Sequence, residues 1–239
     1  MSKGMSERWI VVWASSLLVL AGPIGAQEKS VRPGINKPFE NPNVSEFLAK
    51  WETESREIYQ FRREIVEACA VHQGMVVADI GAGTGLFTRL FAQAVGPRGK
   101  VYALDISPAF VEYVAKTCKE QKLNNVEARV CRADDVGLPP ESVDLAFICD
   151  TYHHFEFPLR TMHSIHKALR PTGRVVLIDF HRIEGKSSAW VLGHVRAGQD
   201  VFEKEIVSCG FRKVGEKNLL KENYFVLFAK VVPGAGGAR

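Results

Sequence analysis

The strongest constraint on the fold of this chain is a regular alternation of apolar runs with helix-patterned segments. Five apolar runs have the length and residue types of buried strands, at residues 75–80, 100–106, 126–131, 143–150 and 173–180. Three segments between them repeat apolar residues at helical spacing, at residues 85–95, 107–121 and 159–170. Because near-continuous apolar strands are buried on both faces, we predict an α/β fold whose mostly parallel sheet lies between two layers of helices.

The end of the chain breaks this alternation. A helix-patterned segment at 202–211 is followed by two strand-like segments, 211–220 and 223–232, with no helix between them. Two strands joined by a short turn pair in antiparallel fashion. One strand of the sheet is therefore expected to run against the others.

The N-terminal residues differ from the rest in composition. Residues 10–22 are apolar or small throughout, follow two basic residues and precede a further stretch of small residues. This order is typical of a secretory signal peptide, and the run is short for a membrane span, which needs about 20 residues. We predict that residues 1–26 are a signal peptide cleaved after Ala26, or else a membrane anchor through residues 9–25. Either alternative places the protein in the periplasm or at the membrane, and a cytosolic N-terminal helix is the less favoured alternative.

The remaining chain divides by composition. Residues 27–44 are rich in Pro, Gly, Asn and Lys and are predicted to be an extended linker. A helical cap is expected at 45–73, begun by one long helix with Ser45 as its N-cap. The globular domain is expected at 74–232, followed by a flexible tail at 233–239.

Composition excludes several classes of protein. The chain has 239 residues, 46% hydrophobic and 24% charged, which is enough for one well-packed domain. A net charge of +4 without a long basic run favours a mixed solvated surface, and no nucleic-acid partner is expected. Five cysteines without a CxxC motif predict buried thiols, for example Cys131 and Cys149, and no disulfide framework.

A glycine-rich loop, DIGAGTG, follows the first predicted strand and precedes a helix. Its glycines, Gly81, Gly83 and Gly85, allow the backbone to approach a ligand, and the helix N-terminus offers free N–H donors. The third glycine comes one residue earlier than in the GxGxxG fingerprint of dinucleotide-binding proteins. The leading Asp79 is poorly suited to a phosphate and well suited to an ammonium group. The loop therefore favours a ligand with an amino-acid moiety over a dinucleotide.

Two further acids follow later strands. Asp105 ends the second predicted strand, and a carboxylate there can accept hydrogen bonds from both hydroxyls of a ribose. By itself it does not distinguish between nucleoside cofactors. Asp134 follows the third strand and could accept a hydrogen bond from the amino group of an adenine, although Asp134 and Asp135 could also form an exposed turn.

With these features, residues 74–230 resemble the class I S-adenosylmethionine-dependent methyltransferases, notably the small-molecule branch that includes the ubiquinone/menaquinone C-methyltransferases. The resemblance rests on the DxGxGxG loop, on Asp105, on the run ADDVGLPPESVDLAF and on the terminal hairpin. "LPP" replaces the more usual "LPF" in that run. The resemblance implies a Rossmann-like sheet of seven strands, mostly parallel with one antiparallel strand, and helices on both faces.

The resemblance also implies the cofactor, S-adenosyl-L-methionine. The glycines of the loop would lie behind the methionine part of the cofactor. Asp105 would bind the ribose, and Asp134 would contact the adenine. The expected cofactor-binding residues are Asp79, Gly81, Ala82, Gly83, Gly85, Asp105, Ile106, Asp134, Asp135 and Asp150.

The implied reaction is the in-line transfer of a methyl group to a small or medium organic acceptor. A protein or peptide methyltransferase of the cell envelope and a non-catalytic S-adenosylmethionine-binding module are the alternatives. A nicotinamide oxidoreductase is disfavoured by the loop spacing and the terminal hairpin. The sequence does not indicate an oligomeric state.

The acceptor is expected at the carboxyl ends of the fourth and fifth strands. Tyr152, His153 and His154 crowd the loop after the fourth strand, and His154 matches a position where quinone-type relatives often carry histidine. His181 follows the fifth strand in a segment that also holds Asp179, Arg182, His194 and Arg196. The predicted catalytic or substrate-binding residues are His154, Tyr152, His153 and His181, with ordinary loop structure as the alternative.

The helical cap is expected to cover the same mouth, with Trp51, Arg56 and Tyr59 as candidate lining residues. No metal site is assigned. Four histidines, His153, His154, His181 and His194, could approach one another beside Asp150 or Asp179, but no HxH or HExxH spacing supports a metal.

Overall fold

The computed structural model describes residues 27–232. The predicted leader at 1–26 and the predicted tail at 233–239 lie outside the described residues. Within residues 27–232, no helix combines the length and the apolar character that crossing a bilayer requires.

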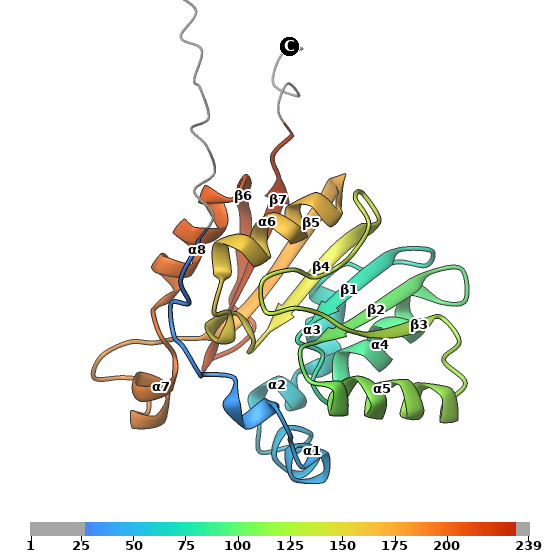
Figure 1. Ribbon diagram of the computed structural model, residues 1–239, viewed down its shortest axis with the longest axis horizontal. Helices are drawn as coiled ribbons and strands as arrows, with labels where there is room; N and C mark the ends of the chain where they lie inside the picture. Colours follow the sequence, from blue (N-terminus) through green and yellow to red (C-terminus); the bar gives the residue numbers. More distant parts are fainter. Residues whose placement is uncertain (1–26, 233–239) are drawn as a thin grey trace, which may run out of the picture.

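One seven-stranded sheet forms the centre of the described part of the chain (Figure 1). Its strands are β1 (Val76–Ile80), β2 (Lys100–Asp105), β3 (Val126–Val130), β4 (Val143–Cys149), β5 (Leu169–Phe180), β6 (Phe211–Lys217) and β7 (Asn223–Lys230). Their order is β3-β2-β1-β4-β5-β7-β6, and β7 runs antiparallel to both of its neighbours. The predicted fold, mostly parallel with one antiparallel strand, is confirmed.

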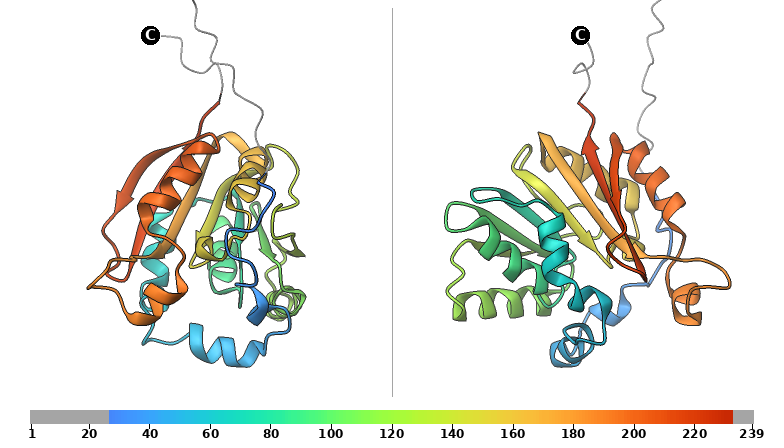
Figure 2. Two further views of the ribbon diagram at one scale, coloured as in Figure 1. Left: turned by 60° about the vertical axis from the view of Figure 1, so that its left-hand side comes forward. Right: turned by 180° about the vertical axis from the view of Figure 1, so that it is seen from behind.

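Helices cover both faces of this sheet. The described part of the chain contains the helices α1 (Val44–Trp51), α2 (Glu57–Gln60), α3 (Arg62–Ala68), α4 (Leu86–Val95), α5 (Pro108–Glu120), α6 (Pro158–Ala168), α7 (Ala189–His194) and α8 (Gln199–Ser208), with short 3-10 helices η1 (Lys37–Phe39) and η2 (Tyr152–His154). Helices α6 and α8 pack on one face, whereas α3, α4 and α5 pack on the other, which is seen from behind in Figure 2.

The two faces are built from alternate residues of the same strands. On β4, Phe147 faces α4, where its ring lies 4.8 Å from that of Phe87 and 4.9 Å from that of Phe91. Its neighbours Ala146 and Ile148 belong to the hydrophobic cluster on the opposite face. Because both faces are buried, β4 needs apolar residues in succession, which explains why its sequence shows no alternation.

The helical cap differs from the single helix that the sequence predicts. The helix begins at the N-cap Asn43, whose Oδ1 accepts from the N–H of Ser45 at 3.2 Å, and ends after Trp51. Glu52 then binds the Arg89 guanidinium of α4 through both carboxylate oxygens, each at 2.8 Å. Arg56 turns toward Asp150 at the end of β4. Contacts to distant elements replace helical hydrogen bonds at this break.

Residues 27–43, which lie within the linker predicted at 27–44, pack against the domain and are here named the N-terminal strap. The N–H of Val31 donates to the carbonyl of Glu156 at 2.9 Å. The Asn36 side chain donates to the carbonyl of His154 at 3.1 Å, and Arg32 donates to that of Gly193 at 2.9 Å. The strap therefore ties the loop after β4 to α7.

Two smaller expectations also change. Strand β5 begins at Leu169, earlier than predicted, and passes through Pro171. The register of β4 and β5 shifts around this proline, and pairing with β7 starts only at Arg174. Pro171, which has no N–H to donate, therefore does not have to form a hydrogen bond within the sheet. All five cysteines are free thiols, but Cys131 and Cys149 are only half-buried.

Candidate active site

The carboxyl ends of the parallel strands open into a cavity of about 590 Å³. Its floor is formed by loops that follow β1, β2 and β4, and its walls by the N-terminal strap, α1 and the α7 segment. In Figure 1, α1 and α7 both lie beyond the ends of the strands. A volume between about 300 and 1,000 Å³ is usual for a small-molecule site, and a parallel sheet places such sites at this edge.

The glycine loop is shaped by close packing. Gly81 has φ +72°, and a methyl group on it would lie 2.2 Å from Cγ2 of Thr151. Gly83 has φ +52°, and a methyl there would meet the Trp51 ring at 2.9 Å. Both positions therefore need glycine for conformation and for space. Both line the cavity together with Ala82, whereas Gly85 does not: it is the N-cap of α4.

Asp105 is fixed at the cavity wall by the backbone. One carboxylate oxygen accepts the N–H of Ser107 at 2.9 Å and the other accepts the N–H of Gly83 at 2.8 Å. Burial raises the pKa of this carboxyl, and the backbone donors oppose the shift. Each oxygen keeps a lone pair for a hydroxyl donor, which fits a ribose. Ile106 lines the cavity beside it.

Asp79 and Asp150 bring two further carboxyls to the cavity. Asp79 accepts the Thr88 hydroxyl at 2.6 Å, and burial raises its pKa to about 7. Asp150 has φ +48°, accepts the Asn223 amide at 2.6 Å and forms an ion pair with Arg56. Burial raises the pKa of Asp150 and the Arg56 charge opposes that shift. An acidic cavity suits a cationic ligand.

Two further predicted cofactor residues also lie outside the cavity lining. Asp134 binds Arg132 at 2.9 Å and Arg160 at 2.5 Å, and the hydrogen bond from Arg132 lowers the pKa of its carboxyl. Asp135 accepts the N–H of Gly137 at 2.8 Å and caps a turn. The chain just before them, Cys131, Arg132 and Ala133, lines the cavity instead. An adenine contact from Asp134 stays a prediction.

Aromatic rings form one wall of the cavity. Trp51 lies 4.6 Å from Phe47 and 5.6 Å from Phe110, and Phe39 lies 6.2 Å from Trp51, all between ring centroids. Trp51 and Arg56 line the cavity as expected, but Tyr59 does not; its ring lies under Arg62. Phe39, Phe47 and Phe110 could not be singled out in the sequence, because an apolar residue on a helix usually indicates core packing.

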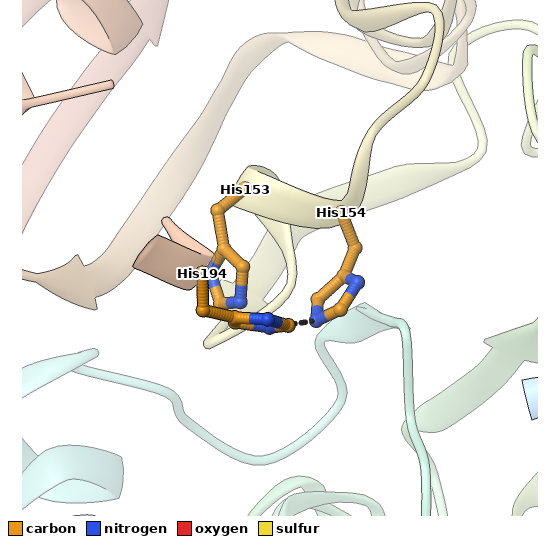
Figure 3. A group of neighbouring side chains, drawn as sticks. All are labelled: His153, His154 and His194. Atoms are coloured by element: carbon orange, nitrogen blue, oxygen red, sulfur yellow. Dashed lines mark hydrogen bonds between the residues drawn. The ribbon is translucent and has the colours of Figure 1, made fainter. Parts of the chain in front are cut away.

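Three histidines meet on another wall of the cavity (Figure 3). His153 is buried, and its Nδ1 lies 2.8 Å from Oδ1 of the buried Asp179. Asp179 also accepts the backbone N–H of His153 at 3.1 Å. The carboxylate thus holds the proton on Nδ1 and leaves Nε2 with a free lone pair.

His154 and His194 complete this group. Their Nε2 atoms lie 3.3 Å apart, and the His194 ring stacks on Trp190 with centroids 4.6 Å apart. Burial, followed by the charges of His153, His194 and Arg32, lowers the pKa of His154 to about 2. Burial also lowers the pKa of His194. His154 is therefore a poor proton acceptor, and His153 with Asp179 has the better geometry for that role.

The other two predicted catalytic residues do not line this cavity. Tyr152 is fully buried behind it, donates to Glu205 at 3.1 Å and packs on Phe202 with centroids 4.9 Å apart. The His181 ring packs on Tyr224 at 5.6 Å and does not line the cavity. The one-turn helix η2 accounts for the position of Tyr152, because it directs Tyr152 into the core and the two following histidines toward the cavity.

Comparisons with known proteins identify the family of this chain. A family model described as "Methyltransferase domain" matches residues 71–224, well over half of the chain. The ubiquinone/menaquinone biosynthesis C-methyltransferase UbiE of Hydrogenovibrio crunogenus is 26% identical over 124 residues, which are 52% of this chain and 49% of that protein. The chain thus spans about half the length of the curated relatives it matches.

Solved structures share the fold. A SAM-dependent methyltransferase from Aquifex aeolicus superposes with a TM-score of 0.71 at 22% identity, covering 80% of this chain and all of that one. The [4+2]-cyclase SpnF superposes with a TM-score of 0.63 at 14% identity, covering 72% of this chain and 81% of that one. At these identities the likeness concerns the fold alone.

The predicted family and cofactor are confirmed by the family match together with the curated relatives. The cofactor is S-adenosylmethionine, and the observed residues fit it: a carboxylate with two free lone pairs at the ribose position, and acids where a cationic ligand would bind. The chain belongs to the methyltransferase-domain family.

Proposed function

We propose that this protein transfers the methyl group of S-adenosylmethionine to a small organic acceptor. The observation that carries the proposal is the division of one cavity into two sides. Asp79, Asp105 and Asp150 surround the glycine loop, whereas His153 and His154 face the same cavity from the loop after β4. A donor and an acceptor bound on these two sides would be neighbours, as an in-line transfer requires.

Each residue on the cofactor side has a distinct role in the proposal. The cofactor, when bound, supplies an electrophilic methyl group on a sulfonium. Asp105 accepts hydrogen bonds from the ribose hydroxyls, and Asp79 binds the ammonium of the methionine part. Arg56 holds Asp150 in place, and the Trp51 ring closes over the glycine loop, which keeps water from the methyl group.

The acceptor side favours a flat, largely apolar molecule with a polar group. Phe39, Phe155, Phe180 and Trp190 line this part of the cavity around the histidines. The ubiquinone and menaquinone in the names of the relatives are of this kind, and we propose an aromatic or quinone-like acceptor on that ground. A protein or peptide acceptor is disfavoured, because the strap and α7 cover the histidines.

Ligand-induced stabilisation tests the proposal directly. At 100 times its Kd, S-adenosylmethionine should stabilise the protein by about 2.7 kcal/mol, which raises the Tm by roughly 5–10 °C for a domain of this size. NAD at the same concentration should leave the Tm unchanged. A screen of phenolic and quinol acceptors with cofactor labelled in the methyl group then identifies the acceptor. Stabilisation by NAD without stabilisation by S-adenosylmethionine would overturn the proposal.

We also propose that the protein acts outside the cytosol, on the composition of residues 1–26. Fractionation of cells that express the full chain with a C-terminal tag tests this. The expected result is a periplasmic product shortened by the leader, or an uncleaved product in the membrane fraction. A full-length product in the soluble cytosol would contradict export.

A further inference from the structure

The three histidines converge from segments far apart in the sequence. His153 and His154 lie on η2, directly after β4, and His194 is the last residue of α7. Each offers one ring nitrogen, and these atoms all lie within 4.8 Å of one another. Figure 3 shows the three rings turned toward a common point. Imidazole nitrogens gathered this closely are typical ligands of a transition metal.

The distances approach those of a metal site. Two nitrogens that bind one tetrahedral Zn²⁺ at about 2.0–2.1 Å lie roughly 3.3 Å apart. The Nε2 atoms of His154 and His194 are 3.3 Å apart. The widest separation in the cluster must close by roughly 1–1.5 Å to reach that value. Nδ1 of His154 has no hydrogen-bond partner among residues 27–232, so no hydrogen bond at that atom has to break when the ring shifts.

Asp179 gives the cluster the support that metal ligands usually have. A histidine that binds a metal commonly donates its other ring N–H to a carboxylate, which fixes the tautomer and raises the basicity of the ligand nitrogen. Asp179 does this for His153 at 2.8 Å. In the described part of the chain, His153 is also its sole ion-pair partner. A cation at the cluster would balance this buried negative charge.

The third histidine is held by its backbone. Arg32 of the N-terminal strap donates to the carbonyls of Gly193 and His194. Arg182 donates to the carbonyls of Leu192 and Val195, each at 3.0 Å. Two arginines thus fix the end of α7, and the stacked Trp190 limits rotation of the His194 ring. These contacts hold the His194 ring in place, as expected for a metal ligand.

We propose that His153, His154 and His194 form a binding site for a divalent transition metal such as Zn²⁺. Three protein ligands leave a fourth position, and all three residues line the cavity, so that position faces the acceptor side. Sites with three histidines and one open position are typical of zinc ions that act on a substrate, whereas structural sites are closed by four protein ligands. Metal binding stands on this geometry alone.

The role of the metal rests on the proposed function. The open position would bind an oxygen of the acceptor and lower the pKa of its hydroxyl, so that its proton leaves to water. The nucleophilic atom of the acceptor then forms its bond to the methyl carbon as the carbon–sulfur bond of the sulfonium breaks. The electron pair of that bond stays on sulfur, and no oxidant or reductant is needed.

Calorimetric titration of Zn²⁺ into EDTA-treated full-length protein tests the site. One ion should bind per chain, and His153→Ala or His194→Ala should weaken binding more than 100-fold. His72→Ala is the matched control, because His72 is exposed and lies before β1, away from the cavity; it should bind Zn²⁺ as the wild type does. Asp179→Asn should weaken binding by about 10- to 100-fold. Co²⁺ bound in place of Zn²⁺ should show the visible absorption of a tetrahedral ion.

A titration of S-adenosylmethionine on the same samples separates this inference from the proposed function. Cofactor binding without Zn²⁺ binding would overturn the metal site and leave the methyltransferase function intact, with His153 and Asp179 as the proton acceptor. Zn²⁺ binding without cofactor binding would overturn the methyltransferase function and leave the metal site intact. Zn²⁺ binding that survives both histidine substitutions would place the ion elsewhere and overturn the inference. Circular dichroism and Tm of each variant show that a loss of binding is not a loss of folding.

Discussion

Binding of the cofactor should depend on pH because of Asp79. Its carboxyl is buried under the glycine loop, and burial raises its pKa to about 7 although the Thr88 hydroxyl donates to it. An ammonium group placed beside Asp79 favours the ionised carboxylate. Cofactor binding should therefore expel a proton from this carboxyl, and the affinity should rise as the pH rises through 7.

The magnitude follows from the fraction of Asp79 that is ionised before the cofactor binds. With a pKa of about 7, that fraction is about one tenth at pH 6, half at pH 7 and nine tenths at pH 8. If only the ionised form binds well, the Kd should be about tenfold lower at pH 8 than at pH 6. Calorimetry in buffers of different ionisation enthalpy should detect about half a proton released at pH 7.

The free protein should show the opposite trend in stability. A carboxyl whose pKa is raised by folding takes up a proton on folding. Its contribution is fully present below the unfolded pKa of about 3.9 and is lost as the pH rises through about 7. Asp79→Asn cannot ionise, so it should be more stable than the wild type at pH 8 by up to about 4 kcal/mol. Denaturant unfolding at several pH values measures this difference.

Asp79→Asn is also the control for the binding experiment. It should bind the cofactor more weakly than the wild type at pH 8 and show no change in Kd between pH 6 and pH 8. A wild-type Kd that is independent of pH would refute the reasoning. So would the same pH dependence in the variant, because another group would then be responsible.

Three further substitutions, one of them with a matched control, test other parts of the site. Asp105→Ala should abolish the rise in Tm that S-adenosylmethionine produces, while circular dichroism shows a folded protein; a full shift would exclude Asp105 from the cofactor site. Gly81→Ala should cost more than about 2 kcal/mol, from φ +72° and the overlap at 2.2 Å, whereas Gly137→Ala, with φ +65° and open space around it, should cost about 1 kcal/mol in denaturant unfolding. Tyr152→Phe should lose about 1 kcal/mol with its hydrogen bond to Glu205 but retain turnover; a large loss of turnover at unchanged stability would contradict its placement behind the cavity.

The sheet and the glycine loop could be predicted because their signals are local. A strand buried on both faces must be apolar in succession, and β4 is visible in the sequence for that reason. Gly81 and Gly83 have positive φ values within a loop between a strand and a helix. Such a loop can be found in the sequence by its short glycine motif. Asp105 is found by its place at the end of β2. These inferences need no knowledge of distant contacts.

The rest of the site depends on contacts that no local pattern encodes. The cap helix ends where Glu52 reaches Arg89, 37 residues away. His154 and His194 are 40 residues apart and meet only because α7 folds back over the cavity. The orientation of Tyr152, which points into the core while its neighbours face the cavity, is decided by the short helix η2. Residue type indicated reactive side chains here, but it did not indicate which of them face the ligand.

The antiparallel strand β7 helps to position Asp150 and the loop that follows β4. Because β7 runs against the other strands, its first residue, Asn223, lies at the edge where they end, and its amide binds Asp150 at 2.6 Å. Asp150 holds φ +48°, which is costly for a residue other than glycine, and Arg56 secures its other oxygen. The turn begun there brings Thr151 against Gly81 and carries the following histidines to the acceptor side. If β7 ran parallel to the other strands, its carboxyl end, and not Asn223, would lie beside Asp150. The antiparallel hairpin therefore helps to fix the loop after β4, which contacts both the cofactor side and the acceptor side of the cavity.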